Sequence, residues 1–223
     1  AISINAPITT TAGRSVNVTN RTASSSVTFP KRISDSGTGI NITGNSATST
    51  FAFTGGLTLS TGANNAFNVA GGGKLSVTQN GTTTINTITT TTGVALSVAN
   101  TNIEAAGLTF RSISSSGGGN VGISLVSTGT DGGLTVTGLD GLDGDSDPDL
   151  GSGGTISGKT GSDGATNAGI GVYLSDTRNI SLNGMQFSNF ENSAIRGVSV
   201  TKFRLVSSTI SGNVGNNTGM TEA

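Results

Sequence analysis

Two successive copies of one unit lie between Ala168 and Asn217, and they decide the fold. The first copy reads RNISLNGMQF at residues 178–187, and the second reads TKFRLVSSTI at residues 201–210. Ile180 aligns with Phe203, and Leu182 aligns with Leu205 at the same interval. Apolar residues at alternate positions indicate a strand with one buried face. A repeat of roughly 20–30 residues, built from short strands and turns, predicts a solenoid in which each turn stacks on the next.

A similar register runs through the N-terminal half. Segments that begin at Gly39, Ala66 and Gly93 follow one another at equal intervals, and one that begins at Gly122 follows after a slightly longer interval. Further strand-like runs lie between them, at Phe51–Phe53, Leu57–Leu59, Lys74–Val77, Leu108–Phe110 and Leu134–Val136. Turns of about 23–29 residues with two or three short strands favour a parallel β-helix over a two-sheet sandwich. Gly and Asn at the corners supply the positive-φ positions that sharp bends require.

The composition is polar but does not indicate disorder. Hydrophobic residues make up 32% of the 223 residues, and there are 36 glycines. Disordered chains usually carry many charges and prolines, whereas here charged residues are 10% and prolines number three. A thin core that repeats along an axis needs few apolar residues in each turn, so an ordered solenoid fits this composition.

Several function classes are disfavoured by the residue types. The net charge is −1, with no histidine, no cysteine and one tyrosine. Nucleic-acid binding needs a basic surface and usually stacking aromatics. No run of about 18 apolar residues predicts a membrane span. Disulfides and thiolate metal sites require cysteine, and its absence fits a large secreted bacterial protein. We expect no catalytic residues and no cofactor, with one exception for calcium.

The exception is an acidic interruption of the repeat at residues 138–165, which we interpret as a loop inserted into one turn. Five aspartates fall within ten residues, and four of them are candidate calcium ligands: Asp143, Asp145, Asp147 and Asp149. Alternating carboxylates resemble the first ligands of calcium loops, but the glycine and glutamate of an EF-hand are not in place. The alternatives are a calcium site of low affinity and a solvated acidic loop.

The sequence resembles the long "beta strand repeat-containing" proteins of bacteria over most of its length, from about Val16 to Gly215. The segments that carry the resemblance are Gly37–Ile40, Phe53–Asn64, Gly107–Ser114, Gly132–Gly138, Gly153–Ile156 and Asn179–Met185. The resemblance implies a secreted or surface-anchored right-handed β-helix, similar in style to autotransporter and adhesin passengers. The resemblance implies no catalytic motif, so it identifies no site residues in this sequence.

Three further patterns have a functional and a structural interpretation. Asp176, Arg178 and Glu191 form the best carboxylate constellation for a polysaccharide hydrolase or lyase, but we interpret Asp176 as a turn cap. Threonine runs at 82–84 and 89–92 resemble ice-binding arrays, although Thr-x-Thr does not recur at the repeat interval. Asn189, Asn192 and Asn213 are interpreted as stacked turn residues that hydrogen-bond between turns.

The leading interpretation is a non-enzymatic structural scaffold, stalk or adhesin segment, secreted or at the cell surface, which can assemble into filaments. Residues 1–223 are expected to be one β-helix segment of a longer chain. Its expected partners are itself or further repeats of the same kind, with surface polysaccharide or another cell as further possibilities. The alternative is a protein that binds or cleaves polysaccharide.

Overall fold

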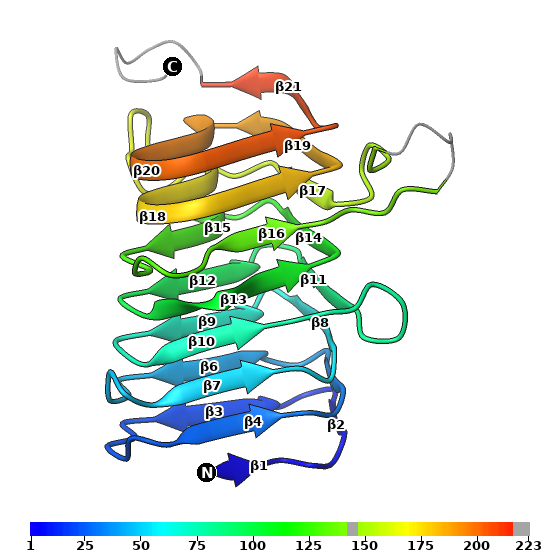
Figure 1. The fold of residues 1–223 in the computed structure, drawn as a ribbon. Helices are drawn as coiled ribbons and strands as arrows, with labels where there is room; N and C mark the ends of the chain where they lie inside the picture. Colours follow the sequence, from blue (N-terminus) through cyan, green and yellow to red (C-terminus); the bar gives the residue numbers. More distant parts are fainter. Residues whose placement is uncertain (142–146, 216–223) are drawn as a thin grey trace.

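The computed structural model describes residues 1–141 and 147–215 as a three-sided parallel β-solenoid of about eight turns (Figure 1). Among these residues there are 21 strands and no helix. Each turn adds one strand to each of three faces. Faces 1 and 3 belong to one 13-stranded sheet, because the long strand β18 bends from one face to the other. Face 2 is a separate 8-stranded sheet.

The strands follow one another around the three faces in a fixed order. Face 1 contains β1 (Ile2–Ser3), β4 (Ser26–Phe29), β7 (Thr50–Phe53), β10 (Lys74–Val77), β13 (Asn102–Phe110) and β16 (Leu134–Val136). Face 2 contains β2 (Ile8–Thr10), β5 (Ile33–Asp35), β8 (Leu57–Gly62), β11 (Asn86–Thr90), β14 (Ser112–Ser116), β17 (Gly154–Ser157), β19 (Met185–Phe190) and β21 (Thr209–Val214). Face 3 contains β3 (Val16–Thr19), β6 (Ile40–Thr43), β9 (Phe67–Ala70), β12 (Leu96–Ala99) and β15 (Val121–Val126). The long strands β18 (Ile170–Asn183) and β20 (Ser193–Val206) contribute to faces 3 and 1 in turn.

Every strand pairing is parallel, which confirms the predicted fold class. In Figure 1 the front strands run to the right and the rear strands to the left as the chain rises, which is a right-handed winding. Val27 pairs with Phe51, and Ile180 pairs with Phe203, so turns near both ends have similar lengths. The turn that holds the acidic insertion is longer, since Ile123 pairs with Val172.

A single hydrophobic core runs through the middle of the solenoid, because alternate residues of every face point inward. Phenylalanines fill much of this core in the N-terminal turns, which are the lower turns in Figure 1. The rings of Phe29 and Phe53 stack with their centroids 4.6 Å apart, and Phe53 meets Phe67 edge to face at 5.4 Å. Of the eight phenylalanines, Phe203 alone is exposed. Each core side chain therefore packs against a side chain of the same row in the neighbouring turn.

The corners use the residues that the sequence predicts. Non-glycine residues with positive φ include Asn20, Asn100, Asp176, Asn179 and Asn189, with φ between 50° and 59°. Asparagine and aspartate tolerate this left-handed region better than most residues. The positive φ of Asp176 agrees with its interpretation as a turn residue, because it lies where β18 bends from face 3 to face 1.

The register predicted around Gly93 is wrong by two residues. The sequence pattern places Gly93 opposite Ala66, but Phe67 pairs with Leu96, so Ala95 takes the position of Ala66. The extra residues lie in the loop between β10 and β11, because Val77 still pairs with Phe53 whereas Asn86 already pairs with Leu57 at the longer interval. A slip of two residues keeps the same side chains inward, so the alternation cannot detect it.

The interpretation of residues 138–165 as one loop needs a correction as well. Residues 154–157 form β17, which pairs with β14 on one side and with β19 on the other. The acidic excursion therefore ends before Gly154, and a second, shorter excursion follows Gly158. Ile156, the inward residue of β17, is fully buried and continues the core of face 2.

The two stacked rows predicted from the repeat are present. Ile180 pairs with Phe203 and Leu182 with Leu205, as the spacing of the two copies predicts. Ile180 and Leu182 are buried, whereas Phe203 is 40% exposed because it lies on the last turn that the structure describes. The pair gives a test of the core, since the same row contains one covered and one uncovered side chain.

We expect Ile180→Asp to lower the free energy of unfolding by several kcal/mol, because it buries a carboxylate among apolar side chains. Phe203→Asp serves as the matched control and is expected to cost much less, since its side chain already meets solvent. Urea unfolding of both variants measures the difference. Equal effects, or an unchanged transition for Ile180→Asp, would contradict the packing of this row.

Candidate functional site

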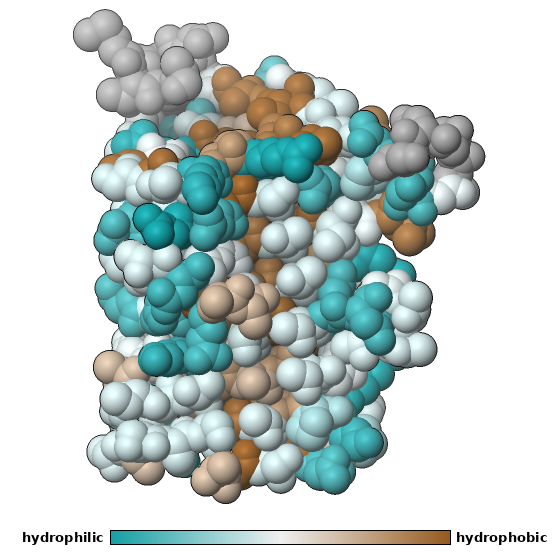
Figure 2. All heavy atoms as spheres, in the orientation of Figure 1, coloured by the Kyte–Doolittle hydropathy of each residue, from teal (hydrophilic) through white to brown (hydrophobic). Residues whose placement is uncertain are grey.

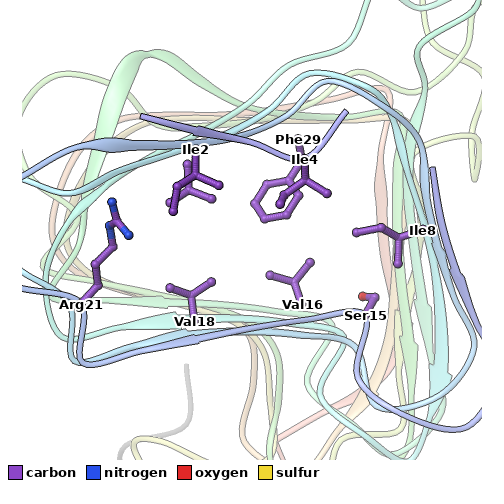
Figure 3. A pocket seen from close by; sticks show the side chains of 9 residues that line it. Ile2, Ile4, Ile8, Ser15, Val16, Val18, Arg21 and Phe29 are labelled. Atoms are coloured by element: carbon purple, nitrogen blue, oxygen red, sulfur yellow. The ribbon is translucent and has the colours of Figure 1, made fainter. Parts of the chain in front are cut away.

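The lower end of the solenoid contains an open apolar chamber of about 280 Å³. Figure 3 shows Ile2, Ile4 and Phe29 on one side of it and Val16 and Val18 on the other. Arg21 points into the chamber from the side opposite Ile8 (Figure 3), and it donates a hydrogen bond to Ser25. Its Nε is buried without a hydrogen-bond partner among the described residues. The chamber is the open end of the hydrophobic core.

The upper end also exposes apolar side chains. Val198, Phe203, Ile210 and Val214 are between 37% and 48% exposed, and they belong to β20 and β21. Figure 2 shows brown, apolar atoms gathered at this end, while the side of the solenoid is mostly pale and teal, with brown atoms visible in between. Both ends of the described solenoid thus present core residues together with the outermost strands of each face.

The structure describes only part of the candidate calcium site. Asp143 and Asp145 lie outside the described residues. Asp147 and Asp149 lie where the loop returns to the solenoid, and together with Ser207–Thr209 they line a cleft of about 270 Å³. Within residues 1–141 and 147–215, no three acidic side chains gather closely enough to hold a metal ion. The calcium hypothesis therefore stays a prediction.

Asp176 and Glu191 do not form a carboxylate pair. Asp176 lies at the corner between faces 3 and 1, and Glu191 follows β19 at the corner between faces 2 and 3. The strand from Ile170 to Ser175 separates these corners and spans roughly 17 Å, more than the roughly 5–10 Å that glycoside hydrolysis needs between carboxyl groups. Arg178 donates a hydrogen bond from Nη1 to the carbonyl of Thr130 at 2.8 Å, so it braces a neighbouring turn.

Lys159 is fully buried, and sequence reasoning missed it. Its Nζ donates to Ser115 Oγ and to the carbonyl of Gly117, both at 2.6 Å, and to Asn120 Oδ1 at 3.4 Å. Ser115 Oγ in turn donates to the carbonyl of Gly93 at 2.9 Å. Burial lowers the pKa of Lys159 from 10.5 to about 8.

A serine beside a lysine of lowered pKa has the composition of a nucleophile and its base. Ser115 is only 1% exposed, however, so a substrate cannot reach its Oγ. The hydroxyl is also held by its bond to Gly93. This cluster joins the corner that follows β14 to the corner that follows β17, and its role is structural.

Asn189 and Asn192 hydrogen-bond between turns through their side-chain amides, as expected. Asn213 donates its backbone N–H to Asn189 Oδ1 at 3.2 Å, which is one contact between turns. Asn192 bonds to the second excursion, which belongs to the preceding turn: its Oδ1 accepts from the N–H of Gly164, and its Nδ2 donates to the carbonyls of Ser162 and Ala168. A ladder of side-chain amides also lies on face 3. There Asn41 donates to Asn17, and Asn68 donates to Asn41, each at 2.9 Å.

Face 2 presents rows of hydroxyl groups to solvent. Ser34 pairs with Thr58, Thr58 with Thr87, and Thr87 with Ser112, so one row crosses four successive turns. A second row contains Ser60, Thr89 and Ser114. Because serine replaces threonine at several of these positions, Thr-x-Thr itself does not recur from turn to turn, although the hydroxyl groups do. The Arg32 side chain also bonds Thr58, so the array is not a uniform threonine plane.

A cleft of about 320 Å³ lies beside these rows, at the corner between faces 1 and 2. Thr58 and Thr87 line it, together with the loop at residues 82–85 and the two arginines Arg32 and Arg111. Sequence reasoning missed these residues. Their positions in the sequence could have identified them, because each arginine directly precedes a strand of face 2. This pattern can be recognised only when the register of the turns is known.

The described residues contain no helical segment with the length and apolarity of a membrane crossing. No known protein family matches the chain, and no curated protein or solved structure matches it. The class that the structure defines is therefore that of its fold, a parallel β-solenoid.

We expect the acidic loop to be dispensable for folding. Replacing residues 140–148 with a short Gly/Ser link should change the free energy of unfolding by less than about 1 kcal/mol, because loop closure entropy depends weakly on length. Asp149 is retained, since its backbone carbonyl accepts hydrogen bonds from Ser152. Chemical denaturation measures the effect, and a loop deletion that unfolds the protein would contradict it.

A calcium-induced rise in melting temperature, abolished by Asp145→Asn with Asp147→Asn, would establish a site.

Lys159 should make stability depend on alkaline pH. Its pKa is about 8 when folded and 10.5 when unfolded. Between these values the unfolded chain binds a proton that the folded chain lacks, so the free energy of unfolding rises with pH, by at most about 3 kcal/mol. Below pH 8 this gain is absent, because the amine is protonated in both states.

Urea unfolding between pH 7 and 10.5 compares the parent chain with Lys159→Met, which removes the titrating group. The stability of the parent relative to this variant should increase with pH over that range. Lys74→Met, at an exposed lysine on β10, is the control and should leave the pH dependence unchanged. A constant difference between the parent and Lys159→Met would contradict the lowered pKa.

Proposed function

We propose that this chain is a structural scaffold, a stalk or adhesin segment of a secreted or cell-surface protein. The observation that supports the proposal is that the core and the strand ladders continue from turn to turn without a break. One hydrophobic core and three ladders of parallel strands run through all the described turns. Each turn is therefore held by its two neighbours, as in other repeat proteins, and the whole forms a stiff body.

The proposal that the protein is secreted or lies at the cell surface rests on the sequence. The Gly-, Ser-, Thr- and Asn-rich repeats resemble the bacterial beta strand repeat-containing proteins, which implies a secreted or surface-anchored right-handed β-helix. The near-neutral charge and the polar outer faces suit a body that extends other domains away from a cell. We propose that its partners are further turns of the same kind or a second copy.

The two ends support stacking as the mode of assembly. The lower end offers the apolar chamber, and the upper end offers Phe203 and Ile210. The outermost strands at both ends have backbone groups that a parallel strand can pair with, and exposed edges are templates for association. Stacking upper end on lower end would keep all strands parallel and would cover both sets of apolar side chains.

We expect this 223-residue chain to associate in a concentration-dependent way, as sedimentation velocity would show. Ile210→Lys places a charge on the upper end and should shift the distribution toward the monomer. Thr109→Lys, on the side of the solenoid at β13, is the matched control and should leave association unchanged. A single monomeric species at all concentrations would contradict stacking through the ends.

Polysaccharide cleavage is the opposing proposal, and it is tested separately. The separation of Asp176 and Glu191 does not favour it. Release of reducing sugar from a panel of polysaccharides, lost on Asp176→Asn, would overturn the non-enzymatic scaffold.

A further inference from the structure

The cleft between faces 1 and 2 combines a hydroxyl floor with two cationic side chains. Thr58 on β8 and Thr87 on β11 form neighbouring positions of one hydroxyl row. Arg32 precedes β5 and Arg111 precedes β14, so their backbones are three strand steps apart, or roughly 14 Å along the axis. The two guanidinium groups therefore stand at opposite ends of one cleft, with hydroxyls between them.

The wall of the cleft is the loop between β10 and β11, which projects from the right side of the solenoid in Figure 1. Asn80 fixes its shape, because Oδ1 accepts hydrogen bonds from the backbone N–H groups of Thr82, Thr83 and Thr84 at 2.8–3.1 Å. Asn86 closes the base by donating to the carbonyl of Thr78 at 2.9 Å. A wall held in this way loses little conformational freedom when a ligand binds.

The charge of the cleft is positive. Among the residues that the structure describes, no carboxylate lines it, and the Arg111 side chain has no hydrogen-bond or ion-pair partner there. Arg32 donates from Nη2 to Thr58 Oγ1 at 2.7 Å, which leaves its other N–H groups available to a ligand. Guanidinium groups pair with carboxylates through two parallel hydrogen bonds, so an acid group fits both ends of the cleft.

A smaller hollow of about 140 Å³ extends the cleft along the axis and shares Thr58 with it. The hydroxyl residues that line it include Thr9, Ser34 and Ser60. Asp35 also lines it, but this carboxylate is buried and accepts hydrogen bonds from the backbone N–H groups of Ser15 and Gly37. The extended shape suits a chain of several units better than a single small molecule.

We propose that this cleft binds an acidic polysaccharide whose sugars carry carboxylates. The sugar hydroxyls would exchange hydrogen bonds with the threonine and serine row, while the carboxylates pair with Arg32 and Arg111. No aromatic side chain lines the cleft among the described residues, so it lacks the stacking platform that single-stranded nucleic acids use. The site lies on the side of the solenoid and does not depend on end stacking.

Titration calorimetry of the full chain with oligogalacturonate tests the proposal. We expect binding that weakens about tenfold or more in Arg32→Gln and in Arg111→Gln, since each substitution removes a charge-assisted contact. Arg14→Gln makes the same charge change at the corner between β2 and β3, and it should leave the affinity within about twofold. Thr58→Val and Thr87→Val keep the side-chain shape and should weaken binding through the lost hydroxyls.

The methyl-esterified oligomer, which has the same sugars without charge, should bind at least about tenfold more weakly. Circular dichroism melting checks that each variant is folded. The proposal is overturned if oligogalacturonate does not bind, if the methyl ester binds equally well, or if the double variant at Arg32 and Arg111 binds as the parent does. It is also overturned if a sulfated oligosaccharide or a DNA oligomer binds while oligogalacturonate does not. None of these outcomes bears on end-to-end association, which sedimentation tests.

Discussion

The backbone ladder between successive turns is the interaction on which the rest of the structure depends. Parallel strands pair at a fixed register, so each residue lies above the residue one turn earlier in the chain. An inward side chain must therefore fit the side chain below it, and an outward one forms a row along the axis. The stacked rings of Phe29 and Phe53 and the amide ladder of Asn17, Asn41 and Asn68 both follow from this register.

At the corners, the strand ladder leaves backbone N–H and carbonyl groups without a partner. Buried polar side chains form hydrogen bonds with these groups. Asn86 accepts the N–H of Leu57 and donates to the carbonyls of Thr78 and Thr109, so one amide serves three backbone groups. Lys159 and Asn192 do the same at the corners between faces 2 and 3. A buried polar group without a partner is costly, which explains why these positions are fully bonded.

The sequence predicted the fold because its side-chain alternation has a period of two and its repeat is regular at residues 178–210. It could not fix the register at Gly93, where a two-residue shift leaves the alternation unchanged. It missed β17 because glycines and small polar residues flank Ile156, which is the only inward side chain of β17 larger than glycine. The cleft of Arg32 and Arg111 could not be predicted, since it needs residues from four turns to be placed in register.

Two corner excursions leave the solenoid from the same edge. The loop between β10 and β11 and the excursion between β16 and β17 both project to the right in Figure 1, at the boundary of faces 1 and 2. The body therefore lacks rotational symmetry about its long axis. Two such bodies that packed edge to edge there would bring these loops against each other, whereas at β18 the chain passes the corner between faces 3 and 1 within a single strand.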